Sequence, residues 1–343
     1  MKSLSSSDAF KDSLSDFMEI IPENSNLNGE DLISGVGADK LLSELISVFS
    51  SSGGEVISFF LLLLGLGLFS SLAESGAALF GARLNAAMKA GIGAISALLI
   101  FSSLRSLVFS VCESLESISS FFSSLIPIIT GISLSFGAIN SASVQAINMN
   151  LTLSILGFLS SELLVPLVFM IFSLSLVSSV GSGPSRLLKS ARSVFLWGLG
   201  IISSALVASI SMQSFLAVAK DNAALRAAKY ALSGMVPIVG STVSGSLSIL
   251  FGSLSEARAV VGVGAVAVVF FLAASPLALM LLYRLALSVA SWIFEFLAEG
   301  SIGSHLLAFR SALDTLISLY ALSSVVYILE IVIFIKGGVS VFV

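Results

Sequence analysis

The stretch AVVGVGAVAVVFFLAASPLALMLLY, residues Ala259–Tyr283, decides the fold of this chain. It runs for 25 residues without a charged side chain. A helix of about 20 apolar residues is long enough to cross the ~30 Å hydrocarbon core of a bilayer. The stretch therefore predicts a transmembrane helix.

Five further stretches have the same length and apolar character. They are residues 56–73, 90–111, 163–180, 194–219 and 313–335. The whole chain is 56% hydrophobic and only 10% charged, whereas an ordinary soluble domain is about 25% charged. We therefore predict an all-α, polytopic membrane helical bundle with six transmembrane helices.

Two uncharged stretches are interrupted by proline and glycine. Residues 117–161 contain Pro127, and residues 230–255 contain Pro237. Irregular backbone at membrane depth is tolerated where it is buried in protein or lines a cavity. We interpret both stretches as re-entrant helical hairpins, because neither reads as one uninterrupted span.

The two hairpins also indicate a parallel internal repeat. The separation of Pro127 from Pro166 equals that of Pro237 from Pro276, since 166 − 127 and 276 − 237 are both 39. Each half has the order hairpin, proline-containing span, Arg-Ser, span. We expect a transmembrane domain over 56–343 with a two-helix unit at 56–112, a first repeat at 113–219 and a second at 220–335, although chance similarity among apolar segments is the alternative.

The N-terminal segment 1–55 is acidic and rich in serine. It holds ten acidic and three basic residues, a net charge of −7, and leaves +3 for the rest of the chain. Within it, Asp39–Phe49 has apolar residues at helical spacing, which is typical of a surface helix. A flexible tail with one weak helix is the competing interpretation.

Basic residues in short loops predict the orientation. Arg83 and Lys89 lie in one loop, and Arg186, Lys189 and Arg192 in another on the same side of the six-span arrangement. That side is expected to be cytoplasmic, which places residues 1–55 and both hairpins outside. Lys220, Arg226 and Lys229 fall on the outer side and run against the rule.

The sequence offers no catalytic centre, metal site or cofactor site. His305 is the single histidine and Cys112 the single cysteine, so histidine-pair zinc sites and disulfides within the chain are excluded. No phosphate-binding loop motif is present. Nucleic acid is excluded as a partner because no basic stripe carries interleaved aromatic residues.

The candidate working residues are polar or helix-breaking groups within the hairpins and charged groups within or beside the spans. Serine makes up about a fifth of the chain, which suits close helix packing or a wet lining. Intramembrane charge is costly and is a functional candidate by default. The hairpin candidates are Pro127, Asn140, Gln145, Asn148, Pro237, Ser241 and Thr242, and the charged candidates are Arg105, Glu162, Arg284 and Glu330. Arg105 and Glu330 are the stronger candidates for a buried pair or a polar lining, because Glu162 and Arg284 can reach an interface.

Several motifs in order resemble the stage III sporulation protein AE family. The stretch from Lys189 to Ser246 carries a basic entry before a Trp-Gly span, Gln213 at the end of that span, the Leu225-Arg226-x-Ala-Lys229 segment and Val236-Pro237-Ile-Val-Gly240. Ile126-Pro127 with Asn140-Ser141-Ala142, and Leu281-x-Tyr283-Arg284-Leu285, also fit. The resemblance covers residue 56 to the C-terminus, whereas the acidic N-terminus departs from the signal-like segment of many members.

This resemblance implies a multi-pass protein of the mother-cell membrane around the forespore in endospore-forming bacteria. Its implied partners are the other stage III A sporulation proteins and a forespore-side protein, which together form a transenvelope complex similar to secretion systems. We therefore expect a channel or export-platform subunit that contacts membrane lipid and other copies of itself. A stand-alone small-solute transporter and a purely structural membrane anchor are the alternatives.

Overall fold

The computed structural model describes residues 38–78, 82–135, 137–164, 166, 169–170, 173, 183–235, 240–297 and 302–336. These residues form α-helices and one π-helical turn, and no strand occurs among them. The elements are α3 (Ala38–Ala78), α4 (Ala82–Ser135), α5 (Ile139–Phe158), η1 (Leu159–Leu164), α7 (Gly183–Met235), α8 (Gly240–Leu297) and α9 (Ile302–Lys336). The all-helical prediction is confirmed for this part of the chain.

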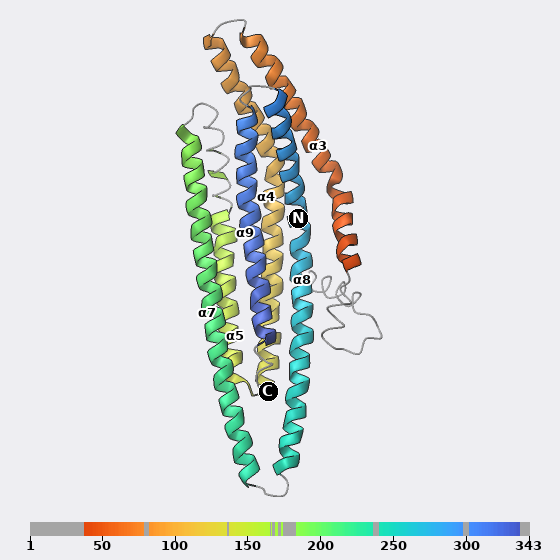
Figure 1. The fold of residues 1–343 in the computed structure, drawn as a ribbon, viewed down its shortest axis with the longest axis vertical. Coiled ribbons are helices and arrows are strands. Elements are labelled where there is room, and N and C mark those ends of the chain that lie inside the picture. The colour runs from red at the N-terminus through yellow and green to blue at the C-terminus, as the bar shows by residue number, and fades with distance from the viewer. Residues whose placement is uncertain are drawn as a thin grey trace.

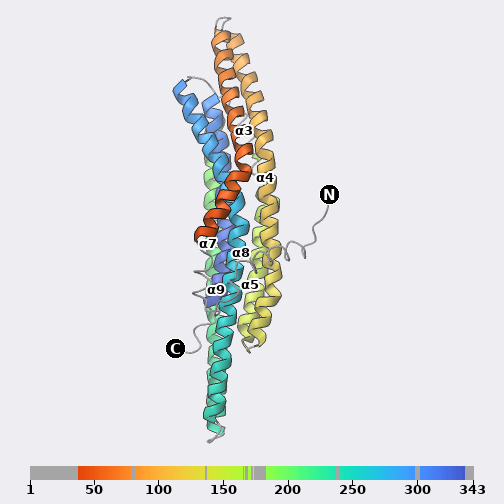
Figure 2. The ribbon, with the colours of Figure 1, turned by 90° about the vertical axis from the view of Figure 1, so that its right-hand side faces the viewer.

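The helices run along the long axis of an elongated bundle (Figures 1 and 2). Helix α9 lies in the middle and packs along α8, and it also contacts α4, α5 and α7. The α3–α4 pair reaches furthest at one end, and the α7–α8 pair reaches furthest at the other. The shorter α5 fills the space between α4 and α7.

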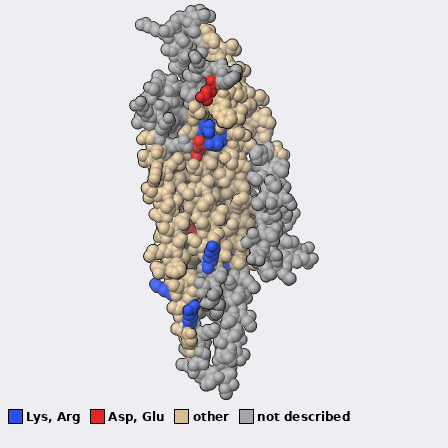
Figure 3. All heavy atoms as spheres, in the orientation of Figure 1, with Lys and Arg blue, Asp and Glu red and all other residues tan. Residues whose placement is uncertain are grey.

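Five helices are long and apolar enough to cross a membrane. They contain Gly53–Ala73, Gly91–Ser135, Ser193–Ala224, Ala257–Glu295 and Phe309–Lys336. Charged side chains are sparse on the face in Figure 3, where a broad uncharged surface separates the few that are visible. The protein is therefore a multi-pass membrane protein. The remaining expected span, 163–180, lies largely outside the described residues.

Several helices are far longer than the spans expected from the sequence. Helix α8 has 58 residues, which at 1.5 Å per residue is about 87 Å and exceeds the ~30 Å hydrocarbon core. Each long helix joins elements that the sequence interpretation separates. Helix α4 includes the second span and the first arm of the first hairpin, and α7 and α8 likewise continue into the arms of the second.

The expected break at Pro127 is wrong. Helix α4 continues through Pro127, and the chain reverses at Gly137, which has a φ of 73°. Proline is tolerated in membrane helices because neighbouring groups satisfy the freed carbonyl. Pro237 lies outside the described residues. The re-entrant placement, the repeat and the orientation remain predictions, and the proposed unit boundaries at 112/113 and 219/220 fall inside α4 and α7.

The expected helix at Asp39–Phe49 is present, but it is not a separate surface element. Helix α3 begins at Ala38 and continues without a break into the first span. The helix continues through the Gly53-Gly54 pair, so the amphipathic segment and the apolar segment form one 41-residue helix. Residues 1–37 lie outside the described part of the chain.

Serine–tyrosine pairs fasten α4 to α9 inside the core. Tyr320 and Tyr327 are fully buried, and their hydroxyls hydrogen-bond to Ser114 at 2.7 Å and Ser119 at 2.8 Å. The ring of Phe122 packs on Tyr327 with centroids 4.7 Å apart. Buried tyrosine requires such a partner for its hydroxyl, so part of the serine content of α4 serves packing.

Glycine permits the close approach of α3 and α8. A Cβ atom built on Gly67 would lie 1.8 Å from the ring of Phe294, whereas nothing lies within 4 Å of one built on Gly65. Real atoms never approach so closely, so any side chain at position 67 would displace Phe294. Gly67 and Gly65 therefore provide a test position and a control position on the same helix.

We predict that Gly67→Ala destabilises the purified protein by about 1–3 kcal/mol through overpacking against Phe294. Gly65→Ala should leave stability unchanged or raise it slightly, since alanine favours helix over glycine by up to about 1 kcal/mol. Thermal unfolding of the detergent-solubilised chain measures both. Equal stability of the two variants would contradict the close α3–α8 contact.

Candidate functional site

A tight turn places the start of α5 against α4. The N–H of Gly137 donates to the carbonyl of Leu134 at 3.0 Å, and the N–H of Ala138 donates to that of Ser133 at 3.1 Å. This pair of bonds is the Schellman pattern that ends helices at a residue with positive φ. Glycine supplies that conformation without strain.

Helix α5 is capped by a carboxylate from another helix. Its N-cap residue, Ala138, has no side-chain cap. Asp221 of α7 accepts hydrogen bonds from the N–H of Asn140 at 3.1 Å, the N–H of Ser141 at 2.7 Å and the Asn140 side-chain amide at 2.8 Å. A negative charge at a helix N-terminus is stabilised by the orphan N–H groups and the helix dipole.

Arg258 of α8 provides the positive charge of the same cluster. Its residue is only 5% exposed, as is Asp221. The guanidinium Nη2 donates to Ser133 Oγ at 3.1 Å and stacks over Phe334 of α9 at 5.5 Å from the ring centroid, and its charge interacts with that of Asp221. Arg258 thus links α8 to α4, α7 and α9.

A small cavity of about 20 Å³ lies beside Arg258. Its polar lining comes from Ser133, Ser141, Gln145, Ser214 and Arg258. A space of ~10–15 Å³ or more can hold one water when it is polar. The cavity therefore has room for about one water, and four helices contribute its polar groups.

The polar side chains continue from the cavity along α5. Asn148 is fully buried and its amide donates to Ser214 of α7 at 3.4 Å. One turn further is buried Thr152, which lies near the carboxylate of Glu330 on α9. We call this set the buried polar network, in which all members are buried except half-buried Ser141 and exposed Asn140 at the start of α5: Ser133, Asn140, Ser141, Gln145, Asn148, Thr152, Ser214, Asp221, Arg258 and Glu330.

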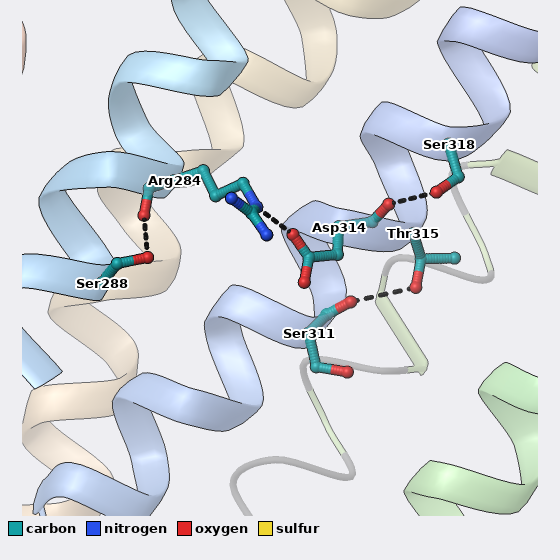
Figure 4. A network of polar contacts seen from close by, with 6 residues as sticks. All are labelled: Arg284, Ser288, Ser311, Asp314, Thr315 and Ser318. Carbon is teal, nitrogen blue, oxygen red and sulfur yellow. Dashed lines mark hydrogen bonds and ion pairs between the residues drawn. The ribbon is translucent and has the colours of Figure 1, made fainter.

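A second charged contact lies between α8 and α9. Arg284 Nε donates to Asp314 Oδ1, and Figure 4 shows the two side chains pointing toward each other across the helix pair. Ser288 and Ser318 donate to the carbonyls of Arg284 and Asp314 at 2.8 and 2.7 Å. Both charged side chains are partly exposed, so this contact is an ion pair at the edge of the bundle.

The structure brings together four of the residues selected from the sequence. Asn140, Gln145, Asn148 and Glu330 all belong to the buried polar network. Arg105 does not meet Glu330, because it is exposed and lies over the ring of Phe109 at 5.5 Å.

The other selected residues lie elsewhere. Pro127 is exposed on α4, Glu162 is exposed on η1, and Arg284 pairs with Asp314. The side chains of Ser241 and Thr242, together with Pro237, lie outside the described part. No group of three His, Cys, Asp or Glu side chains is placed to hold a metal ion among the residues that the structure describes.

Sequence reasoning missed Asp221 and Arg258. The fourth and fifth spans expected from the sequence end at residue 219 and begin at residue 259, so both residues lie just outside them. For Arg258 a signal is available, because uncharged sequence begins at the next residue and continues to Tyr283. A charge at the edge of a long apolar helix remains a candidate for burial when the helix extends past the expected span.

We predict that Asp221→Ala lowers stability by about 1–3 kcal/mol, because it leaves the N–H groups of Asn140 and Ser141 without their acceptor and removes the charge that interacts with Arg258. Lys220→Ala, at the adjacent exposed position, should have little effect. Replacing both members, as Asp221→Ala with Arg258→Met, should cost less than Asp221→Ala alone. Thermal unfolding in detergent ranks the three, and similar losses from the Asp221 and Lys220 variants would refute the cap.

Two comparisons with known proteins point to the same family. A family model described as Stage III sporulation protein AE matches residues 22–338. A curated Stage III sporulation protein AE from Bacillus subtilis (strain 168) is 22% identical over 228 residues, which cover 66% of this chain and 57% of that protein. The chain therefore aligns with little more than half the length of that relative. No solved structure matches.

Proposed function

The chain belongs to the stage III sporulation protein AE family, and on that premise we propose that it is a membrane subunit of the transenvelope complex between mother cell and forespore. In this proposal it lies in the mother-cell membrane around the forespore and acts without a catalytic centre of its own. Its partners are the other stage III A sporulation proteins and a forespore-side protein. Its role is that of a channel or export-platform subunit needed for endospore development.

The observation that carries the platform role is the buried polar network. Polar and charged groups inside a membrane bundle are costly and are retained where they serve a function. Here they link α4, α5, α7 and α8 around one small cavity that α9 also lines. Such a network gives the bundle a defined internal arrangement against which partner subunits can assemble.

The cavity beside Arg258 is not itself a solute site, because it has room for about one water. In the proposed complex, passage runs along surfaces shared with other copies or partners. The structural-anchor alternative keeps the same assembly but passes nothing.

Spore yield tests whether the network is needed for function. Asn148→Leu keeps the side-chain size but removes the polar group from the network. We expect membrane abundance near the wild-type level with a strong loss of heat-resistant spores. Asn150→Leu, at an exposed position on the same helix, should leave both unchanged. Normal spore yield from Asn148→Leu would remove the network from the mechanism.

Reconstitution separates a platform subunit from a stand-alone transporter. We expect liposomes containing only the purified chain to release no entrapped small solute beyond empty liposomes. Flux should require the other stage III A proteins. Saturable flux through the chain alone would instead establish the transporter.

A further inference from the structure

Oxygen atoms without donors gather at one end of the buried polar network. Both carboxylate oxygens of Glu330, the hydroxyl of Thr152 and the side-chain oxygen of Asn148 are inaccessible and have no hydrogen-bond partner among the described residues. Glu330 is 1% exposed, and Thr152 and Asn148 are 0% exposed. All of these atoms can accept a hydrogen bond or bind a cation.

Two neighbouring helices bring these atoms to one level of the bundle. Asn148 and Thr152 are four residues apart on α5 and therefore share a face. Gln145 of α5 and Phe334 of α9 line the same cavity, and Thr152 lies near Glu330. The two helices run in opposite directions (Figure 1). Glu330 is one helical turn before Phe334 on α9, and it therefore lies at about the height of Asn148 and Thr152 on α5.

The charged groups around Glu330 are already engaged elsewhere. On α9, Tyr327 is hydrogen-bonded to Ser119 of α4. Arg258 of α8 stacks over Phe334, donates to Ser133 and interacts with Asp221 of α7. From α5, the described neighbours Asn148 and Thr152 carry no charge. Asp221 accepts three hydrogen bonds, whereas neither oxygen of Glu330 accepts one and the hydroxyl of Thr152 is the donor that lies beside it.

A bare carboxylate in such surroundings is strongly disfavoured, because it has lost water and gained no partner. Its charge must be neutralised by a proton or by a bound cation. A small hard cation such as Na⁺ prefers oxygen ligands. Thr152 supplies one such oxygen beside Glu330, and the unpartnered oxygen of Asn148 lies one turn away on the same helix. An anion would be repelled at this position, because the carboxylate of Glu330 is itself negative.

We propose that Glu330, with Thr152 and Asn148, forms a binding site for one small monovalent cation, H⁺ or Na⁺, inside the bundle. The cation neutralises the carboxylate, and the oxygens of Thr152 and Asn148 complete its surroundings when it is Na⁺. This site concerns the chain by itself and does not depend on the proposed complex.

Thermal unfolding of the purified full-length chain tests the site. Melting temperatures are measured over a pH series in choline chloride and again with NaCl or KCl at equal ionic strength. For the wild type we expect stability to fall as pH rises, because the folded chain retains a cation that the unfolded chain releases. Glu330→Gln, which is neutral and similar in size, should lose this dependence. Glu116→Gln, at an exposed position on α4, should keep it.

The salts identify the cation. Recovery of stability by NaCl but not KCl at high pH identifies Na⁺, and Thr152→Val should then raise the Na⁺ concentration at half effect by about tenfold. No recovery by either salt, with the pH dependence still lost in Glu330→Gln, identifies H⁺. Parallel profiles for wild type and Glu330→Gln would overturn the proposal.

An infrared measurement on the wild type tests the site without any variant, so it remains valid if Glu330→Gln does not fold. Infrared difference spectra should show the carbonyl band of a protonated, buried carboxyl group, and alkali or NaCl should remove it. Absence of that band, together with no effect of Na⁺ on melting, would also overturn the site.

Discussion

The carboxylate of Asp221 caps the start of α5 from the neighbouring helix α7. A helix start exposes N–H groups that membrane surroundings cannot satisfy. Ala138 offers no cap of its own, so α7 supplies one across the helix contact. The positive charge of Arg258 then interacts favourably with the negative charge of Asp221. The arrangement of α4, α5, α7 and α8 at this end follows from satisfying one helix terminus.

The same constraint explains why polar residues persist in so apolar a bundle. Once Asp221 and Arg258 are buried, the groups beside them need partners, and Ser133 provides one by accepting from Arg258. The serine–tyrosine pairs between α4 and α9 apply the same rule in the rest of the core. Glu330 differs from these groups, because it is a carboxylate whose two oxygens both lack a hydrogen-bond partner in the described chain.

The apolar spans could be predicted from the sequence because length and hydrophobicity act locally. The lengths of α4, α7 and α8 could not, because a proline or a polar residue marks a possible break without showing whether neighbouring helices compensate for it. Pro127 is tolerated within α4, and Gly137 makes the turn instead. Asn148 and Glu330 could be selected as unusual polar groups in apolar surroundings. The pairing of Asp221 with a helix start 81 positions earlier in the sequence depends on tertiary packing that no local pattern records.

Amide hydrogen exchange at Asn140 and Ser141 tests most directly the claim that Asp221 organises this end of the bundle. The first N–H groups of a helix exchange rapidly when the helix end frays and only solvent satisfies them. Our account predicts that these two amides exchange as slowly as amides in the middle of α5, since a buried carboxylate holds both. Exchange as fast as that of a frayed helix terminus in the folded protein would contradict it.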